Sequence, residues 1–137
     1  MGRKTARAII FIEDRLCLIK RIKNGNEYYV FPGGGIKKGE KGKQAVIREV
    51  KEELGIDVKV IKKLYKYKFG EIKEKYYLCE YSNGEYGTGD AKEFNNPFKG
   101  EYIITMIDKK YIPSYLIYPK EIKEKIIKDF LGENEIG

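Results

Sequence analysis

The chain has 137 residues, with 28 lysines and arginines against 21 acidic residues, a formal net charge of +7, two cysteines and no histidine. This length predicts a single domain over residues 1–137 that is large enough to bury a hydrophobic core. The absence of histidine excludes Ser-His-Asp and Cys-His nucleophilic sites, imidazole zinc sites and histidine general acid–base catalysis. Any catalysis must therefore use carboxylates, lysine, arginine, tyrosine or a metal held by oxygen.

The cysteines and the N-terminal residues point to a reducing compartment. Cys17 and Cys79 lie in apolar runs and lack the Cys-x-x-Cys spacing of metal or redox sites, so we expect two reduced, buried thiols. The apolar run AIIFI after the first basic residues is too short for a signal peptide or a membrane span. We therefore expect a cytoplasmic protein with no membrane partner. The positive charge favours anionic partners, such as phosphates, nucleotides or RNA, without choosing among them.

The pattern of apolar residues predicts strands mixed with two separated helices. Runs or alternation of apolar residues predict strands at residues 5–13, 16–22, 27–31, 56–69, 75–81 and 101–107. Apolar residues at helical spacing predict helices at 41–54 and 119–131, the second with a proline near its first turn. This order of elements indicates an α/β or α+β domain.

Three of the connecting segments carry specific signals. Asn24-Gly25 is typical of a tight turn between two strands. The run Pro32-Gly33-Gly34-Gly35 predicts a loop, because glycine and proline interrupt regular structure. Residues 82–99 are rich in Gly, Asn and Asp and are too long for a hairpin turn. Long loops inside compact domains are often functional.

The central helix has an apolar face that we assign to the core. Val46, Ile47, Val50 and Leu54 follow the i, i+3, i+4 rule, and Gly55 ends the helix. Each residue on this face is expected to contact the sheet.

Glu49, Glu52 and Glu53 occupy a separate stripe of the same helix. Like charges at this spacing each cost about 0.2–0.5 kcal/mol, and the stripe lies toward the negative end of the helix dipole. A divalent cation such as Mg²⁺ or Mn²⁺ would offset this repulsion and bridge to substrate phosphates. The alternative for any such helix is a solvated acidic face paired with Arg48 and Lys51. The residues upstream favour the metal.

Residues 34–56 contain a continuous motif. Gly34 is followed after five residues by Glu40, and after seven more by the run Arg48-Glu-Val-Lys-Glu-Glu-Leu-Gly-Ile56. This segment resembles the Nudix box, G-x5-E-x7-R-E-U-x-E-E-x-G-U with U an aliphatic residue, at every specified position. Neither G-x-G-x-x-G nor a P-loop fits the same glycines. The resemblance implies an α/β fold of the Nudix type, an α/β/α sandwich with a mixed sheet, over most of the chain.

The resemblance implies a metal site on the central helix. Glu49 and Glu53, one turn apart, are the expected metal ligands, with Glu52 and the Gly33 carbonyl completing the set. Glu53 or Glu52 is also the expected base for an attacking water. In many members a glutamate from a later loop serves instead, and Glu93 is our candidate there; an ordinary solvated loop charge is the alternative, and Glu101 and Glu85 are weaker candidates.

Other box residues are expected to shape the site. Arg48, with its planar fork of donors, is expected to orient a glutamate, the alternative being a surface pair with Glu52. Glu40 is expected to hold the loop to Arg48 rather than to contact metal. Gly34 and Gly35 let the backbone approach phosphate closely. We assign substrate binding to these two glycines, Lys37 and Phe94. Further candidates are the basic residues Lys20, Arg21, Lys23 and Lys38 for a polyphosphate, and Tyr28, Tyr29, Tyr67 and Tyr118 for a nucleobase.

The implied function is that of a Nudix hydrolase: Mg²⁺-dependent hydrolysis of the pyrophosphate bond in a nucleoside diphosphate linked to another group. The partner is then a nucleotide-type small molecule, and a homodimer is expected from the resemblance alone. One alternative is a domain that senses a nucleotide metabolite without hydrolysing it, although every box glutamate is present. RNA binding or cap removal is a second alternative, raised by the charge of +7. The sequence lacks an RNP motif and a basic–aromatic platform, so we do not expect a nucleic-acid partner.

Overall fold

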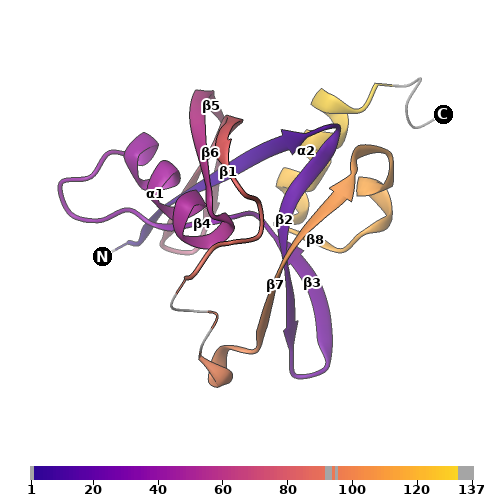
Figure 1. The fold of residues 1–137 in the computed structure, drawn as a ribbon, viewed down its shortest axis with the longest axis horizontal. Coiled ribbons are helices and arrows are strands. Elements are labelled where there is room, and N and C mark those ends of the chain that lie inside the picture. The colour runs from indigo at the N-terminus through magenta and orange to yellow at the C-terminus, as the bar shows by residue number, and fades with distance from the viewer. Residues whose placement is uncertain (1, 92–93, 95, 133–137) are drawn as a thin grey trace.

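The computed structural model describes residues 2–91, 94 and 96–132. Within these residues the helices are α1 (Gly42–Leu54) and α2 (Lys120–Phe130), with short 3₁₀ turns at Pro97–Lys99 and Lys109–Ser114 (Figure 1). The strands are β1 (Lys4–Ile12), β2 (Arg15–Lys23), β3 (Asn26–Val30), β4 (Gly33–Gly35), β5 (Ile56–Phe69), β6 (Ile72–Gly84), β7 (Glu101–Asp108) and β8 (Ile117–Tyr118). They form one sheet in the order β5-β6-β1-β2-β3-β8, with β4 paired to β1 and β7 paired to β2.

The sheet is mixed, and β1 and β2 are joined at only one end. The β1–β6 and β3–β8 pairs are parallel, whereas the remaining pairs are antiparallel. β1 and β2 pair only at Phe11↔Leu16 and Ile12↔Arg15, next to their connecting turn. Farther from the turn, β1 pairs with β4, and β2 pairs with β3 and β7. The two halves of the sheet therefore separate between β4 and β2.

The two helices cover opposite faces of the sheet. Side chains alternate between faces along a strand, so Ala6, Ala8 and Ile10 of β1 join the core cluster under α1, whereas Ile9 joins the cluster under α2. Figure 1 shows α1 and α2 on different sides of the strands. The predicted α/β/α sandwich with a mixed sheet is confirmed.

The structure corrects the predicted loop at the glycine run. Gly33–Gly35 forms β4, in antiparallel register with residues 5–7 of β1. Glycine has a low strand propensity, but here the pairing requires it. Gly33 has φ +145°, and a Cβ atom on it would lie 2.2 Å from the Ala6 carbonyl oxygen. The close backbone approach between the strands therefore explains why a strand forms where composition predicts a loop.

The predicted core face of the central helix is wrong at one position. Val46, Val50 and Leu54 are fully buried, but Ile47 is 39% exposed and Ala45 is buried in its place. The helix is thus rotated toward Ala45, which lies four residues before Glu49 and therefore on the side of the glutamate stripe. Element ends also differ from prediction. β6 extends beyond residues 75–81 in both directions, and α2 starts after Pro119, which is its N-cap.

Both cysteines are buried free thiols, as predicted. Burial raises the pKa of Cys17 to about 12, although a hydrogen bond with Tyr86 opposes the shift. Burial alone raises the pKa of Cys79 to about 12. Neither thiol forms the thiolate that metal binding or redox chemistry needs near neutral pH.

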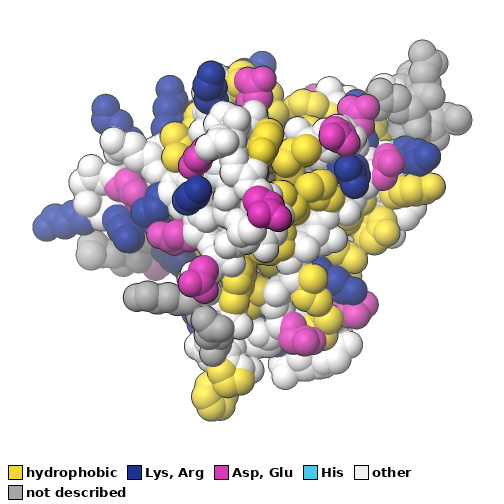
Figure 2. All heavy atoms as spheres, viewed as in Figure 1, with side chains coloured by type: hydrophobic (Ala, Val, Ile, Leu, Met, Phe, Trp, Pro, Cys, Tyr) yellow, Lys and Arg dark blue, Asp and Glu magenta, His cyan; other side chains and the backbone are white. Residues whose placement is uncertain are grey.

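Surface side chains are unevenly distributed. On the face shown in Figure 2, Lys and Arg side chains gather mainly on the side where α1 lies, and apolar side chains gather over the other half of the molecule. Among the described residues, no helix is both long and apolar enough to cross a membrane.

The burial of α1 predicts how two helix substitutions differ. Leu54→Ala should lower the free energy of unfolding by about 2–5 kcal/mol, because it removes a fully buried side chain and leaves a cavity. Ile47→Ala, on the exposed edge of the same helix, should cost less than about 1 kcal/mol. Urea unfolding followed by circular dichroism measures both values, and equal losses would contradict the observed rotation of α1.

Candidate functional site

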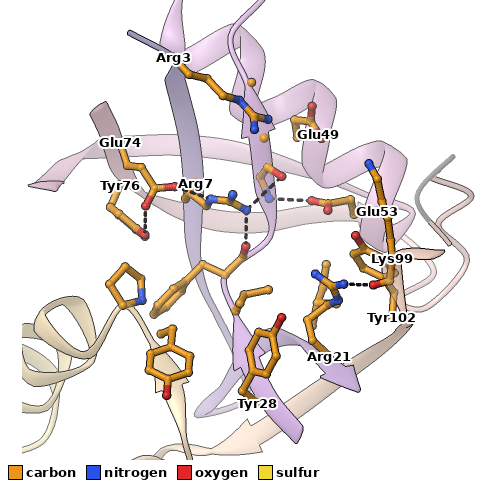
Figure 3. Close-up of a pocket in the computed structure, with 18 residues that line it drawn as sticks. Arg3, Arg7, Arg21, Tyr28, Glu49, Glu53, Glu74, Tyr76, Lys99 and Tyr102 are labelled. Carbon is orange, nitrogen blue, oxygen red and sulfur yellow. Dashed lines mark hydrogen bonds and ion pairs between the residues drawn. The ribbon is translucent and has the colours of Figure 1, made fainter. Parts of the chain in front are cut away.

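A cavity of about 500 Å³ opens where the two halves of the sheet separate (Figure 3). Residues from α1 and from strands β1, β2, β3, β4, β6, β7 and β8 line it. Its charged lining consists of the acids Glu49, Glu53 and Glu74 and the cations Arg3, Arg7, Arg21 and Lys99. Carboxylates and cations thus face the same space.

The acidic wall comes from α1 packed against β4. Glu53 is only 7% exposed, and the Gly33 backbone N–H donates a hydrogen bond of 2.6 Å to its Oε1. The carboxylate of Glu49 lies 2.7 Å from the position that a Cβ atom on Gly34 would occupy. Glycine at this position therefore leaves room for the carboxylate. A buried charge needs such hydrogen-bond partners to offset its lost hydration.

Arg48 fixes the loop before α1 and the carboxylate of Glu49. Its Nε and Nη2 donate to the two oxygens of Glu40 at 2.9 and 3.0 Å, a bidentate pair. Its Nη2 also donates to the Gly35 carbonyl at 3.1 Å, and its Nη1 donates to Glu49 Oε1 at 3.0 Å. The bond to Glu52 is longer, 3.4 Å. The predicted link between Glu40 and Arg48 is confirmed, and the surface pair with Glu52 is secondary.

This bonding shifts the ionisation of Glu40. Hydrogen bonds from Arg48, and then from the Lys37 backbone N–H, lower the pKa of Glu40 from 4.5 to about 2. The same bond to Glu40 raises the pKa of Arg48. Both groups are therefore charged across the neutral range and hold the loop to the helix.

A second ion pair lies at the back of the cavity, between β1 and β6. Arg7 Nε donates to Glu74 Oε2 at 2.9 Å, and the hydroxyls of Thr5 and Tyr76 also donate to Glu74. Burial works against the charged carboxylate, but the charge and hydrogen bonds of Arg7 and the hydroxyl donors lower the pKa of Glu74. Arg7 Nη1 also donates to the Gly33 carbonyl at 3.3 Å. Arg7 therefore contacts the carbonyl that the family resemblance assigns to metal.

Arg21 is held at the side of the cavity opposite α1. Its guanidinium carbon lies 3.7 Å from the ring centroid of Tyr102 and 6.0 Å from that of Tyr28. It donates hydrogen bonds to the carbonyls of Glu101, at 3.3 Å, and Lys99. Figure 3 shows Arg21 between Tyr28 and Tyr102, on the side facing the α1 glutamates. Its orientation is thus fixed by contacts with β3, with β7 and with the segment before β7.

The predicted metal ligands divide into two groups. Glu49, Glu53 and Gly33 line the cavity, as do Gly34 and Gly35, the two glycines predicted to bind substrate. Glu52 does not line it, and its side chain is 46% exposed. The structure therefore brings together most of the predicted ligands and leaves Glu52 toward solvent.

The remaining predicted site residues lie elsewhere. Lys37 is exposed and does not line the cavity. Phe94 packs against Tyr102, with ring centroids 5.6 Å apart, and lines a neighbouring depression. Glu93 lies outside the described residues. Arg48 stands behind Glu49 and does not line the cavity itself.

Comparisons with known proteins identify the family. A family model described as NUDIX domain matches residues 1–97 of the chain. The chain belongs to the NUDIX family. It is a Nudix hydrolase, and the resemblance of residues 34–56 to the Nudix box is confirmed as a family relationship.

Curated relatives and solved structures extend this match. An RNA pyrophosphohydrolase of Campylobacter jejuni subsp. doylei is 31% identical over 135 residues, which cover 86% of this chain and 82% of that protein. A NUDIX hydrolase from Nitrosomonas europaea has a TM-score of 0.72 at 17% identity, covering 95% of this chain and 88% of that one. An ADP-ribose pyrophosphatase from Streptococcus suis has a TM-score of 0.55 at 26% identity, covering 66% and 69%. The names of the Campylobacter and Streptococcus proteins give different substrates, RNA and ADP-ribose.

The geometry of the Nudix box suits a divalent ion held by few protein ligands. No group of three or more Asp, Glu, Cys or His side chains is arranged to hold a metal within residues 2–91, 94 and 96–132. The space left by the missing Cβ of Gly34 nevertheless admits the Glu49 carboxylate beside β4, and Glu53 lines the same cavity. Mg²⁺ commonly takes only one or two protein carboxylates, together with waters and substrate phosphates. These residues therefore fit such an ion.

Sequence reasoning missed the ion pair at the back of the site. Arg7 is a charged residue inside the apolar first strand, a signal that a buried partner exists. Glu74 and Tyr76 alternate with lysines in β6. This pattern indicates that the two residues share one face of the strand, but it does not indicate which strand lies beside them. Lys99 and Tyr102 carried no distinctive local pattern. The parallel register of β1 and β6 places Arg7 opposite Tyr76 and so brings Arg7, Glu74 and Tyr76 close together.

The Glu40–Arg48 pair predicts a pH-dependent loss of stability. Because the folded pKa of Glu40 is about 2, below its ordinary 4.5, its contribution is present above pH 4.5 and is lost as the pH falls toward 2. The Tm of the native protein should therefore exceed that of Glu40→Gln at neutral pH, and the difference should shrink between pH 4.5 and pH 2. Calorimetry at several pH values measures this. Glu124→Gln, on the exposed side of α2, controls for loss of one acidic charge, and a difference that is constant with pH would contradict the pairing.

Proposed function

We propose that this Nudix hydrolase catalyses the divalent-metal-dependent hydrolysis of a pyrophosphate bond in a nucleotide-type substrate, such as a nucleoside diphosphate linked to another group. The observation that carries the proposal is the single cavity in which Glu49 and Glu53 face Arg3, Arg7 and Arg21. Metal-dependent hydrolysis of a phosphate chain uses both acidic and basic side chains. Carboxylates hold the metal, and arginines neutralise phosphate oxygens.

The proposed metal ligands are the Glu49 and Glu53 carboxylates and the Gly33 carbonyl. That carbonyl also accepts a bond from Arg7, but a carbonyl oxygen has two lone pairs. When bound, Mg²⁺ or Mn²⁺ would polarise a phosphoryl oxygen and lower the pKa of a coordinated water. Arg48 keeps Glu49 in place through its 3.0 Å bond.

The attacking water needs a proton acceptor close to the phosphorus. Glu53 is our first candidate, because it lines the cavity and its carboxylate is held by the Gly33 N–H. Glu52 is a second candidate, although its exposed side chain would have to turn toward the cavity. Glu93 stays a candidate from the sequence.

Hydrolysis is favoured over metabolite sensing without catalysis. All four box glutamates are present, and two of them, Glu49 and Glu53, line the cavity with hydrogen-bond partners. A binding module would need the cations but not the buried Glu53.

The first experiment tests the proposed reaction. The chain should hydrolyse at least one of ADP-ribose, dinucleoside polyphosphates, nucleotide sugars or (oxidised) nucleoside triphosphates with Mg²⁺ or Mn²⁺. Glu53→Gln should lower kcat by about 10²–10⁴-fold with a smaller change in KM, because it removes the proposed proton acceptor and a metal ligand. Glu124→Gln is the control and should act as the native chain does. Inactivity of the native chain on every substrate with both metals, or equal rates for Glu53→Gln, would overturn the proposal.

The 5′ end of RNA is a second candidate substrate. The specific observation that favours it is the name RNA pyrophosphohydrolase carried by relatives that are 31% identical over 135 residues. The net charge of +7 is compatible with a polyanionic substrate. Nucleic acid is thus a stronger candidate than the sequence motifs alone indicate.

A second assay separates RNA from free nucleotides. With a 5′-triphosphorylated oligoribonucleotide, the chain should release pyrophosphate and leave a 5′-monophosphate end. Its kcat/KM for this substrate should exceed that for the matching nucleoside triphosphate by about tenfold or more, because the RNA offers further phosphates to bind. The 5′-monophosphorylated oligonucleotide is the blank and should release nothing. A higher kcat/KM for the free nucleotide would rule against RNA as the preferred substrate.

A further inference from the structure

Three neighbouring strands present a group of lysines that the cavity does not use. We define the lysine face by its members, which are Lys4 of β1, Lys63, Lys66 and Lys68 of β5, and Lys73 and Lys75 of β6. All are exposed except Lys75, which is half-buried. None lines the cavity that holds the candidate active site.

The strand register places these lysines in adjacent rows. Lys4 is opposite Lys73, and Lys73 is opposite Lys68, so one row runs across β1, β6 and β5. In the next row on the same face, Lys75 is opposite Lys66. Because side chains two residues apart share a face, both rows point the same way.

This face is the one that α1 partly covers. Lys63 is opposite Tyr77, and Tyr77 belongs to the core cluster under α1. The hydroxyl of Tyr77 lies 2.2 Å from the position of a Cβ on Gly42, the first residue of α1. The lysine rows therefore begin beside the start of α1 and continue beyond it toward the β5–β6 turn.

The rows place like charges directly across from one another, an arrangement that destabilises a sheet. Within the described part of the chain, no carboxylate forms an ion pair with any of the six lysines. A depression of about 250 Å³ lies among Lys4, Lys68 and Lys73, and Glu71 is the acidic residue in its lining. A bound polyanion would offset the repulsion between these lysines.

The dimensions of the face favour a chain of phosphates over a single one. Strands are about 4.8 Å apart, and residues two apart on one face are about 6.8 Å apart, so the six lysines cover about 10 by 14 Å. Nucleic acids carry one charge per nucleotide along a continuous backbone, and lysines neutralise it without reading sequence. The lysine face thus matches several successive phosphates.

The lysine face is linked to the active-site cavity at the start of β1. Arg3 lines the cavity, and the next residue, Lys4, belongs to the lysine face. On β6, Lys73 is likewise followed by Glu74, which lines the cavity. Because successive side chains of a strand point to opposite faces, Glu74 lies on the face opposite Lys73. An RNA chain leaving the cavity would therefore reach the lysines by passing around the start of β1, beside Arg3 and Lys4.

We propose that the lysine face binds the phosphodiester backbone of an RNA whose 5′ end occupies the cavity. This inference rests on the second proposed function, RNA 5′-end hydrolysis, and assigns a binding surface to the body of that substrate. Short nucleotides would not reach the lysine face, so the surface would discriminate by length and not by base.

The test uses the full chain and a fluorescent single-stranded RNA with a 5′-monophosphate, whose binding needs no hydrolysis. The variant is Lys4→Gln/Lys68→Gln/Lys73→Gln. The matched control, Lys110→Gln/Lys120→Gln/Lys128→Gln, removes the same charge from exposed positions at and near α2. Fluorescence anisotropy gives Kd at a series of salt concentrations, and the Tm of each variant confirms folding.

The lysine-face variant should weaken RNA binding by about tenfold or more at low salt. Its plot of log Kd against log salt should be shallower by about 2, since each lost phosphate contact removes about 0.7 from the slope for single strands. The control should match the native chain in its Kd at low salt and in the slope of log Kd against log salt. An unchanged slope in the lysine-face variant, or an equal loss in the control, would overturn the proposal. So would a loss of binding to phosphatidylglycerol vesicles with RNA binding intact.

A hydrolysis assay separates this proposal from the function on which it rests. The lysine-face variant should keep the native rate on a 5′-triphosphorylated dinucleotide and show a raised KM on a long 5′-triphosphorylated RNA. If neither RNA is hydrolysed by the native chain but the variant still loses RNA binding, the RNA pyrophosphohydrolase function fails and the lysine face stands as an RNA-binding surface. Equal KM values of variant and native chain on the long RNA would contradict the lysine face.

Discussion

Three consecutive glycines set the geometry on which the candidate site depends. In Gly33–Gly35, the first N–H donates to Glu53, the second residue makes room for the carboxylate of Glu49, and the third carbonyl accepts from Arg48. A side chain at the first position would collide with the Ala6 carbonyl, 2.2 Å from its Cβ. The missing side chains therefore allow one short strand to pair with β1 on its edge and to support the charged residues of α1 on its face.

Placement of opposite charges around one space follows from the incomplete pairing of β1 and β2. The two strands are joined only near their turn, so the sheet divides and leaves α1 on one side and Arg21 on the other. Arg7 and Glu74 hold the back of this space and neutralise each other in part. The cavity therefore places the carboxylates of Glu49 and Glu53 in the same space as the cations of Arg3, Arg7 and Arg21. A fully paired β1–β2 hairpin would close the site.

The sequence was informative where the site is continuous in the chain and silent where it is not. Spacing alone grouped Glu49, Glu52 and Glu53, because one helix carries all three. The pair of Arg7 and Glu74 depends on the register of strands far apart in the chain, which no local pattern encodes. A helical wheel groups residues into stripes but does not show which stripe faces the core, the cavity or solvent. It therefore placed Ile47 in the core and grouped the exposed Glu52 with the glutamates that line the cavity. Composition assigned Gly33–Gly35 to a loop, since the pairing that makes it a strand is tertiary.

The two buried thiols have a practical consequence for studying this enzyme in solution. Electrophilic labels react with thiolates, and burial keeps Cys17 and Cys79 protonated and out of reach near neutral pH. A cysteine introduced at the rim of the cavity, for instance in place of the 46% exposed Tyr118, would be the one reactive thiol of the folded chain. A fluorophore attached there would report on ligands entering the cavity while the native cysteines stay in place.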